Sequence, residues 1–376
     1  MAISRGCGVF ALFAVTVCAP LGAQQLVADL ASGVVPAPTF RIEKPKVLGT
    51  RCVFFASTPT GAAALFATDG SPNGTRQIEL APAWPASQFA SSLGLLFTVA
   101  TSGSVELWIA SGVAGGTRMV APLPGFEIGS TDVTAWIELP GQVLLTRGGQ
   151  TLWRTDGTSA GTTLLPANVY KSIGNAPPEL ARLGSRAFFA GGSPSDVELW
   201  CSDGTAPGTQ LFYDLRQAGS SYPSNLGVAG GKLFFSADDG VHSREPWATD
   251  GTVAGTLLLH DLANGGHFPR SFTEFLGRAW FCASDPDSGE ELWVSDGTSA
   301  GTRLAVELVA GPASLSIKAL VADLAQLFLV SSSALGGGHS LWVTDGTPLG
   351  TTAVESDTGF TLQVAGGLAM GVRVVG

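Results

Sequence analysis

Short apolar runs alternate with segments rich in glycine, proline and polar residues along the whole chain. In one of the clearest stretches, Thr256 to Leu262 runs toward the dipeptide Asp261-Leu262, Phe272 to Leu276 is a short apolar run, and Ala279 to Ala283 carries adjacent aromatic residues. A further run contains a tryptophan, and apolar runs of this length between turn residues are typical of β-strands. The pattern therefore predicts four strands per repeating unit.

Adjacent large apolar residues mark one strand of every unit. Neighbours on a strand point to opposite faces, so both faces of this strand must be buried. Blades that stack face to face in a propeller bury both faces of their sheets. The pairs are Phe54-Phe55, Leu96-Phe97, Leu144-Leu145, Phe188-Phe189, Phe234-Phe235, Trp280-Phe281 and Leu327-Phe328.

A large aromatic residue followed by an Asp-Gly-Thr turn marks seven copies of the unit. Successive aromatic positions are 42 to 49 residues apart, close to the roughly 40–50 residues of propeller blades. In such a turn Asp accepts backbone hydrogen bonds, Gly permits positive φ and Thr restarts the extended chain, which predicts a structural hairpin connector. The aromatic positions are Phe66, Trp108, Trp153, Trp200, Trp247, Trp293 and Trp342, and the turn aspartates are Asp69, Asp156, Asp203, Asp250, Asp296 and Asp345.

The position of one proline and the two ends of the chain bear on the number of blades. Pro246 stands in the fifth tryptophan strand, and because proline lacks an N–H donor, we expect this strand at the edge of its sheet. Gln25 to Leu30 and Phe360 to Val374 supply three further strands, a unit that lacks only its tryptophan strand. We therefore predict an all-β propeller of four-stranded blades, with eight blades, the last one incomplete, rather than seven.

The first 23 residues have the layout of a secretory signal peptide. Arg5 precedes the apolar stretch from Val9 to Val17, and Pro20 comes before small residues that end at Ala23. We expect residues 1–23 to be removed and residues 24–376 to form a single propeller domain that is periplasmic, at the cell surface or secreted. The apolar stretch is too short to span a membrane and none follows it, so the mature chain is expected to have no integral membrane segment.

Charge and cysteine content narrow the range of partners and cross-links. The formal net charge of −10 becomes −11 once Arg5 is removed, and such a surface repels nucleic acid and anionic lipid. The mature chain keeps Cys52, Cys201 and Cys282, an odd number that excludes a fully paired disulfide framework. For Cys52 and Cys282, which lie in apolar runs, we expect buried free thiols.

The repeated string resembles that of a family of bacterial proteins described by their ELWxxDGT repeats. Glu198 to Thr205 and Glu291 to Thr298 match this string completely, whereas the first copy has Phe66 in place of Trp and the second has Ser111 in place of Asp. The resemblance covers nearly all of the mature chain. It implies export and a tandem, propeller-like architecture, and it carries no established activity over to this chain.

Three residue patterns invite a catalytic or metal-binding interpretation. Gly157 to Gly161 and Gly297 to Gly301 match the Gly-x-Ser-x-Gly pattern of hydrolases, but a nucleophile elbow needs a strand, a turn and then a helix, whereas a hairpin is expected here. The glutamates of the repeat are expected to be solvated edge residues, and the histidines show no metal-ligand spacing. These residues are Glu106, Glu198, Glu245 and Glu291, and His242, His260, His267 and His339.

Two acidic loops follow the aromatic strand in neighbouring units. Asp238 and Asp239 lie in one, and Asp285 and Asp287 in the other. Carboxylates near each other around a turn can gather oxygen ligands for calcium, although a full EF-hand loop is absent. Ordinary polar turns are the simpler interpretation, so we expect no cofactor, with calcium as the one candidate.

The sequence leaves two classes of function open. The first is an exported, non-catalytic binding or scaffold protein, a monomer whose loops bind protein or carbohydrate outside the cytoplasm. The second is an exported hydrolase or lyase with its site at a central channel, built from loop residues that differ between the copies. We favour the first, because every recurring residue of the unit has a structural explanation.

Overall fold

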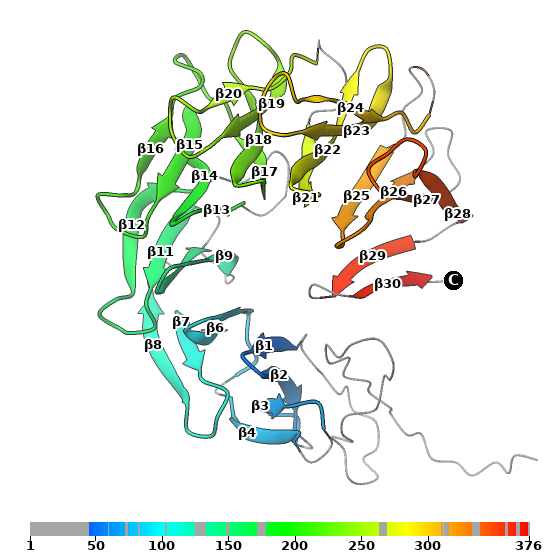
Figure 1. Ribbon diagram of the computed structural model, residues 1–376. Coiled ribbons are helices and arrows are strands. Elements are labelled where there is room, and N and C mark those ends of the chain that lie inside the picture. The colour runs from blue at the N-terminus through cyan, green and yellow to red at the C-terminus, as the bar shows by residue number, and fades with distance from the viewer. Residues whose placement is uncertain are drawn as a thin grey trace, which may run out of the picture. The chain divides into compact units, whose positions relative to one another are not determined.

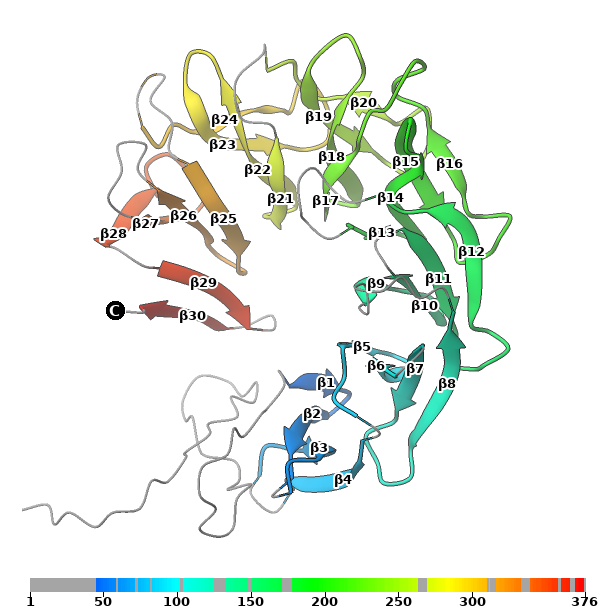
Figure 2. The same cartoon turned by 180° about the vertical axis from the view of Figure 1, so that it is seen from behind.

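The chain folds into antiparallel β-sheets, shown from two opposite sides in Figures 1 and 2. The computed structural model describes residues 45–58, 60–71, 74–81, 83–101, 104–124, 133–147, 150–170, 178–262, 269–309, 311, 316–332, 339–357, 360–365 and 369–374. Over these residues, no helix is long and apolar enough to cross a membrane.

The chain divides into two compact units, residues 1–132 with 157–159 and residues 133–156 with 160–376. The first unit holds two sheets. One consists of β1 (Lys46–Leu48), β2 (Arg51–Ser57), β3 (Ala63–Thr68) and β4 (Arg76–Leu80), and the other of β5 (Ser87–Ser91), β6 (Gly94–Ala100), β7 (Val105–Ala110) and β8 (Thr117–Leu123).

The second unit holds five four-stranded sheets and one two-stranded sheet among its described residues. The first two sheets are β9 (Val133–Leu139), β10 (Gln142–Arg147), β11 (Thr151–Thr155) and β12 (Thr163–Asn168), then β13 (Ala181–Leu183), β14 (Arg186–Ser193), β15 (Asp196–Ser202) and β16 (Gln210–Tyr213). The next two are β17 (Ser224–Ala229), β18 (Lys232–Asp238), β19 (Arg244–Thr249) and β20 (Leu257–Leu258), then β21 (Arg270–Phe275), β22 (Arg278–Asp285), β23 (Gly289–Ser295) and β24 (Arg303–Val306). The last are β25 (Ser316–Ala322), β26 (Leu327–Ser332), β27 (His339–Thr344) and β28 (Thr352–Asp357), followed by β29 (Phe360–Ala365) with β30 (Ala369–Val374).

Each four-stranded sheet is a meander in which strands adjacent in sequence pair side by side. Tight turns make this possible, as between β17 and β18, where Gly230 and Gly231 have φ of 54° and 74°. Two consecutive positive φ values are characteristic of the two-residue turns that match the twist of paired strands. The fold is therefore all-β, built from the four-stranded antiparallel blades of a β-propeller, as the sequence predicts.

The last two strands bear on the predicted eighth blade. Phe360 to Val374 forms the antiparallel pair β29 and β30, as expected. The third strand of that prediction, residues 25–30, lies outside the described residues, as does the predicted signal peptide. The count of eight blades therefore stays a prediction.

The predicted two-sided burial of the second strand is confirmed. Both members of six of the seven apolar pairs are at most 4% exposed, and in the seventh Leu327 is buried while Phe328 is half-buried. The buried side chains pack between consecutive sheets, for example Phe188 and Leu199 of one sheet with Phe235 of the next. Within the second unit, this interface is a hydrophobic layer of its own.

The tryptophan strand is the third strand of its sheet, and the expectation that it lies at an edge is wrong. β19, which contains Pro246, pairs with β18 on one side and β20 on the other. In the preceding sheet the pairing with the fourth strand shifts register between Leu199 and Trp200, the position equivalent to Pro246 and its neighbour. The carbonyl of Pro246 accepts the N–H of Leu259, just beyond β20. β20 pairs with Trp247 and Ala248 only, so no ladder hydrogen bond from the nitrogen of Pro246 is required on that side, which is where proline is tolerated in a sheet.

All three cysteines of the predicted mature chain are buried and unpaired with each other. This confirms the expectation for Cys52 and Cys282 and extends it to Cys201. Burial raises the pKa of the Cys201 and Cys282 thiols. Buried protonated thiols are chemically inert and behave as small apolar residues.

Candidate functional site

The Asp-Gly-Thr turn is a self-contained hydrogen-bond network. In the turn between β15 and β16, the N–H and the hydroxyl of Thr205 donate to Oδ1 of Asp203 at 2.8 and 2.7 Å. Gly208 then donates its N–H to the Thr205 hydroxyl, and the hydroxyls of Ser202 and Thr209 bond to each other. The hydrogen bonds from Thr205 hold the pKa of Asp203 below its usual value. The same contacts to the turn carboxylate recur at Asp250, Asp296 and Asp345.

Close packing against this carboxylate explains the last glycine of the motif. A Cβ on Gly208 would lie 2.1 Å from the Asp203 carboxylate, and one on Gly301 would lie equally near Asp296. Ser299, the serine of one hydrolase-like pattern, lies in the turn between β23 and β24. Its context is a strand-to-strand hairpin, so the elbow interpretation has no structural support.

Backbone carbonyls of the turns also receive donors from the preceding sheet. Gln142 Nε2 donates to the carbonyl of Asp203 at 2.7 Å, and Lys232 Nζ to that of Asp296 at 3.0 Å. Arg186 donates to the carbonyl of Gly251 in the same way. All three donors begin a second strand. Sequence reasoning missed these contacts, although a long polar residue two positions before the apolar pair of each of these three sheets was the available signal.

The repeated aromatic residues lie on the third strand of the four-stranded sheets and differ in their polar contacts. Trp153, Trp247 and Trp293 are at most 9% exposed. Trp108 Nε1 donates to Glu106 at 3.0 Å, and Phe66 stacks on a neighbouring ring of its own sheet. These residues form part of the packed sheets.

Three of the four repeat glutamates are buried acceptors, which corrects the expectation of solvated edge residues, whereas Glu106 is half-buried. Glu198, Glu245 and Glu291 are at most 1% exposed. Each accepts the backbone N–H of a leucine 17 residues further on, namely Leu215, Leu262 and Leu308. Burial raises the pKa of all three glutamates, that of Glu291 to about 7.

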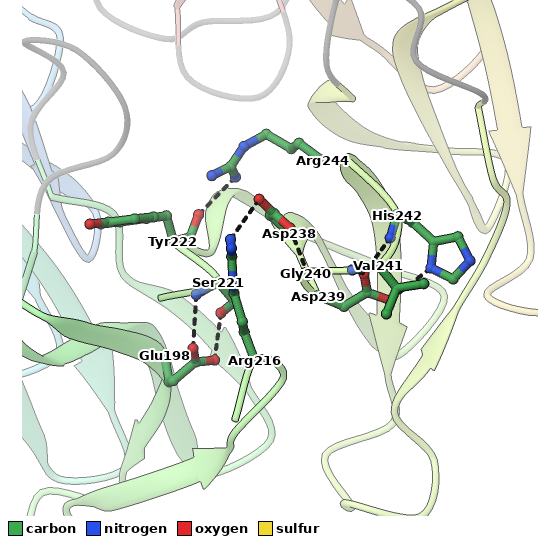
Figure 3. Close-up of polar contacts among 10 residues, drawn as sticks. All are labelled: Glu198, Arg216, Ser221, Tyr222, Asp238, Asp239, Gly240, Val241, His242 and Arg244. Atoms are coloured by element: carbon green, nitrogen blue, oxygen red, sulfur yellow. Dashed lines mark hydrogen bonds and ion pairs between the residues drawn. The ribbon is translucent and has the colours of Figure 1, made fainter. Parts of the chain in front are cut away.

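One loop region combines buried and exposed charges within the second unit. We call it the loop cluster, and it comprises residues 213–222, which link two sheets, and residues 238–244, the turn from β18 into β19 (Figure 3). Glu198 anchors the first segment, because Ser221 donates its N–H at 2.8 Å and its hydroxyl at 2.5 Å to the Glu198 carboxylate.

An ion pair joins the two segments of the loop cluster. Arg216 Nη1 donates to Asp238 Oδ2 at 2.9 Å. Next to it, Asp239 Oδ1 accepts the N–H groups of Val241 and His242, and its Oδ2 lies 2.8 Å from His242 Nδ1. The hydrogen bond to Asp239 raises the pKa of His242. The turn is therefore held by its own carboxylates and tied to the neighbouring loop.

Tyr222 has an unusual backbone conformation and an exposed side chain. Its φ is 47°, a region that bulky residues rarely enter. The residue is 46% exposed. The buried Arg244 donates Nη1 to the Tyr222 carbonyl at 2.7 Å, and in Figure 3 the tyrosine ring points away from the Arg216–Asp238 pair.

A cavity of about 500 Å³ lies between the two segments of the loop cluster, a volume within the range of roughly 300–1,000 Å³ usual for ligand pockets. Its walls are mostly polar. They are formed by Tyr213, Asp214, Leu215, Arg216, Gln217, Ala218, Asp239, Gly240 and Val241.

The calcium candidates serve as turn residues. Asp285 Oδ1 accepts the N–H groups of Asp287 and Ser288, and its Oδ2 accepts the Ser288 hydroxyl. Asp238 and Asp239 are engaged in the loop cluster. In the part of the chain that the structure describes, no three His, Cys, Asp or Glu residues are grouped to hold a metal ion.

One of the four histidines packs on an aromatic residue of the repeat. His260 packs its ring on that of Trp293, at 5.0 Å between centroids, and His267 lies outside the described residues.

Sequence reasoning overlooked an aromatic residue followed by proline, which recurs as Trp84-Pro85, Tyr222-Pro223 and Phe268-Pro269. The intervals are 138 and 46 residues, so this dipeptide follows the period of the repeat.

No model of a known protein family matches the chain, and no curated protein sequence matches it. Among solved structures, the computationally designed Ika8 protein is 15% identical, with a TM-score of 0.47 over 85% of this chain and 89% of that chain. A prolyl endopeptidase is 12% identical, with a TM-score of 0.47, and this chain spans only 52% of its length. The β-propeller domain of the trilobed protease from Pyrococcus furiosus is 10% identical, with a TM-score of 0.39, over 84% of this chain and 98% of that one. The fold assignment stands on the strand order and register described above.

Proposed function

We propose that this chain is an exported, non-catalytic binding protein whose ligand surface is the loop cluster. The observation that carries the proposal is the polar cavity of about 500 Å³, whose flanking segments are fixed by buried groups. Glu198 and Arg244 are 1% and 8% exposed and bond to the backbone of residues 221 and 222. A depression whose walls are already ordered binds a ligand with a small ordering cost.

The sequence supports the proposed location and partner class. The signal-like residues 1–23 and the resemblance to ELWxxDGT-repeat proteins support export and a ligand outside the cytoplasm. A formal charge of −10 disfavours nucleic acid. The proposed partner is therefore a protein or a carbohydrate, bound by a monomer.

Export is tested by expressing the full chain in a bacterium and sequencing the N-terminus of the protein in the extracytoplasmic fraction. We expect it to begin at Gln24. Retention in the cytoplasm with residues 1–23 intact would contradict export.

Binding is tested with the purified mature chain immobilised on a sensor. It is exposed to a panel of glycans and to purified exported proteins, and any hit is confirmed by titration. Arg216→Ala breaks the ion pair to Asp238 and should weaken binding at least about tenfold, since interactions with charged groups contribute about 1.5–3 kcal/mol. Arg303→Ala removes an exposed arginine of β24 and is the matched control. Equal affinities for both variants would exclude the loop cluster as the binding surface.

A further inference from the structure

Three successive N–H groups in the turn from β18 into β19 are donated to side-chain carboxylates. Gly240 donates to Asp238 Oδ1 at 2.7 Å, and Val241 and His242 donate to Asp239 Oδ1 at 2.9 and 2.8 Å. Val241 is 84% exposed, so its side chain contributes little packing to the turn. The orientation of the two carboxylates therefore decides whether this part of the cavity wall is ordered.

The second oxygen of each carboxylate is oriented by a basic side chain. Asp238 Oδ2 accepts from Arg216 at 2.9 Å, and Asp239 Oδ2 lies 2.8 Å from His242 Nδ1 (Figure 3). An arginine side chain is always charged, whereas an imidazole changes its charge near neutral pH. Of these two contacts, only the one from His242 responds to pH in that range.

The equivalent turn of the next sheet, between β22 and β23, has the same geometry with a different side chain in place of the histidine. Asp285 corresponds to Asp239, and its Oδ1 accepts the N–H groups of Asp287 and Ser288, two and three residues further on. Its Oδ2 accepts the Ser288 hydroxyl at 2.7 Å, so Ser288 corresponds to His242. A hydroxyl group therefore completes such a turn, and the imidazole makes the same contact dependent on a proton.

The charged groups around His242 come from three segments and have the same sign. Asp239 lies in the turn, Glu245 on β19 and Asp261 beyond β20, and all three favour the protonated imidazole. The hydrogen bond to Asp239 is the main reason why the pKa of His242 is raised. Although burial opposes it, hydrogen bonds from His242 and from the turn N–H groups lower the pKa of Asp239. Loss of the His242 proton leaves these three carboxylates facing a neutral ring.

We propose that the contact between Asp239 and His242 is a pH-operated clasp, which orders residues 239–241 of the cavity wall when His242 is protonated and loosens them when it is neutral. Because the pKa of His242 is higher in the closed turn than the ordinary value of about 6.5, the stabilisation is full below about pH 6.5 and is lost as the pH rises through the pKa of the closed turn. The contribution of Asp239 is full above about pH 3.9 and is lost as the pH falls through its lowered pKa. This inference goes beyond the proposed binding function, because the state of the turn is measured in the free protein.

Amide hydrogen exchange of the purified chain between about pH 5 and 8 tests the clasp. Protection factors are compared at Val241 and His242, in the clasp, and at Asp287 and Ser288, in the turn that a serine completes. The pKa of His242 is measured in parallel by NMR titration. We expect protection at Val241 and His242 to fall with rising pH, by up to about tenfold for each unit by which the pKa of His242 exceeds about 6.5. Protection at Asp287 and Ser288 should stay constant.

Two variants separate the clasp from other titrating groups. His242→Ser copies the neighbouring turn and should keep the protection of Val241 without its pH dependence. Glu245, whose pKa is raised by burial, is unchanged in this variant, so any dependence that persists belongs to that carboxylate. In Asp239→Asn the pKa of His242 should fall to about 6.5. The inference is overturned if wild-type protection at Val241 is independent of pH, if it changes equally in His242→Ser or at Ser288, or if Asp239→Asn leaves the pKa of His242 unchanged.

Discussion

Removal of the Glu198 carboxylate should destabilise the second unit strongly. The side chain is 1% exposed and accepts three hydrogen bonds, from Leu215 N–H at 3.0 Å and from the N–H and hydroxyl of Ser221. In Glu198→Ala these donors lose their acceptor, at a cost of about 1–3 kcal/mol for each donor that stays buried. Ser221 can rotate its hydroxyl to another acceptor, so the two N–H donors that remain give an expected cost of about 2–6 kcal/mol overall.

Glu198→Gln should cost less, because the amide keeps one acceptor oxygen. If that oxygen faces Leu215 and the Ser221 hydroxyl, a single bond, from the Ser221 N–H, is replaced by a contact between two donors. We expect about 2 kcal/mol. Glu106→Ala is the matched control, since Glu106 is half-buried and accepts one described bond, from Trp108; its loss should cost at most about 1 kcal/mol.

Urea denaturation followed by tryptophan fluorescence measures these free energies of unfolding. Amide hydrogen exchange at Leu215 and Ser221 reports whether the loss is local to the loop cluster. A free energy of unfolding for Glu198→Ala within about 1 kcal/mol of the wild type, or no greater loss than in Glu106→Ala, would refute the anchoring role of this carboxylate.

Three further measurements test other parts of the structure. Burial raises the pKa of Glu291 to about 7, so between about pH 4.3 and 7 the folded state keeps a proton that the unfolded chain has released. The stability that this proton contributes is therefore full below about pH 4.3 and is lost as the pH rises through about 7. Glu291→Gln should flatten the curve of unfolding free energy against pH over this range. Gly208→Ala places a Cβ 2.1 Å from the Asp203 carboxylate and should lower the free energy of unfolding by about 1–3 kcal/mol, whereas Ala206→Gly in the same turn should change it by less than about 1 kcal/mol; equal effects would contradict the packing explanation for the glycine. The carboxylate of Asp285 already accepts turn donors, so the thermal midpoint should be the same with calcium and with a chelator, and a clear rise with calcium would contradict that view.

The hairpin turn and the two-sided strand could be predicted because their causes are local. Asp203 and Thr205 bond within one turn, and the face that each apolar residue takes follows from its neighbour on the strand. The place of the tryptophan strand could not be predicted from Pro246 alone. β20 pairs with Trp247 and Ala248 only, so the ladder ends before Pro246, and the length of the fourth strand is not encoded by the third.

The buried glutamates were misjudged because their partners are backbone amides, which any residue supplies. The constant interval of 17 residues from Glu198 to Leu215 and from Glu245 to Leu262 was nevertheless present in the sequence. The loop cluster was beyond prediction for a different reason. A positive φ at Tyr222 has no signature in residue type, and it depends on hydrogen bonds from two distant strands.

The donors that reach the turn carbonyls from the preceding sheet have a consequence for how such a chain can evolve. Gln142, Arg186 and Lys232 differ in shape and charge, yet each bonds a backbone oxygen, which is the same in every copy. Each such unit carries one side-chain donor and one backbone acceptor, and this pair can bond to any neighbouring unit of the same kind. Tandem duplication or loss of whole units therefore preserves the junctions without compensating substitutions. Sequence drift is free to concentrate in the linking loops, where one copy can acquire a ligand while the others keep the scaffold.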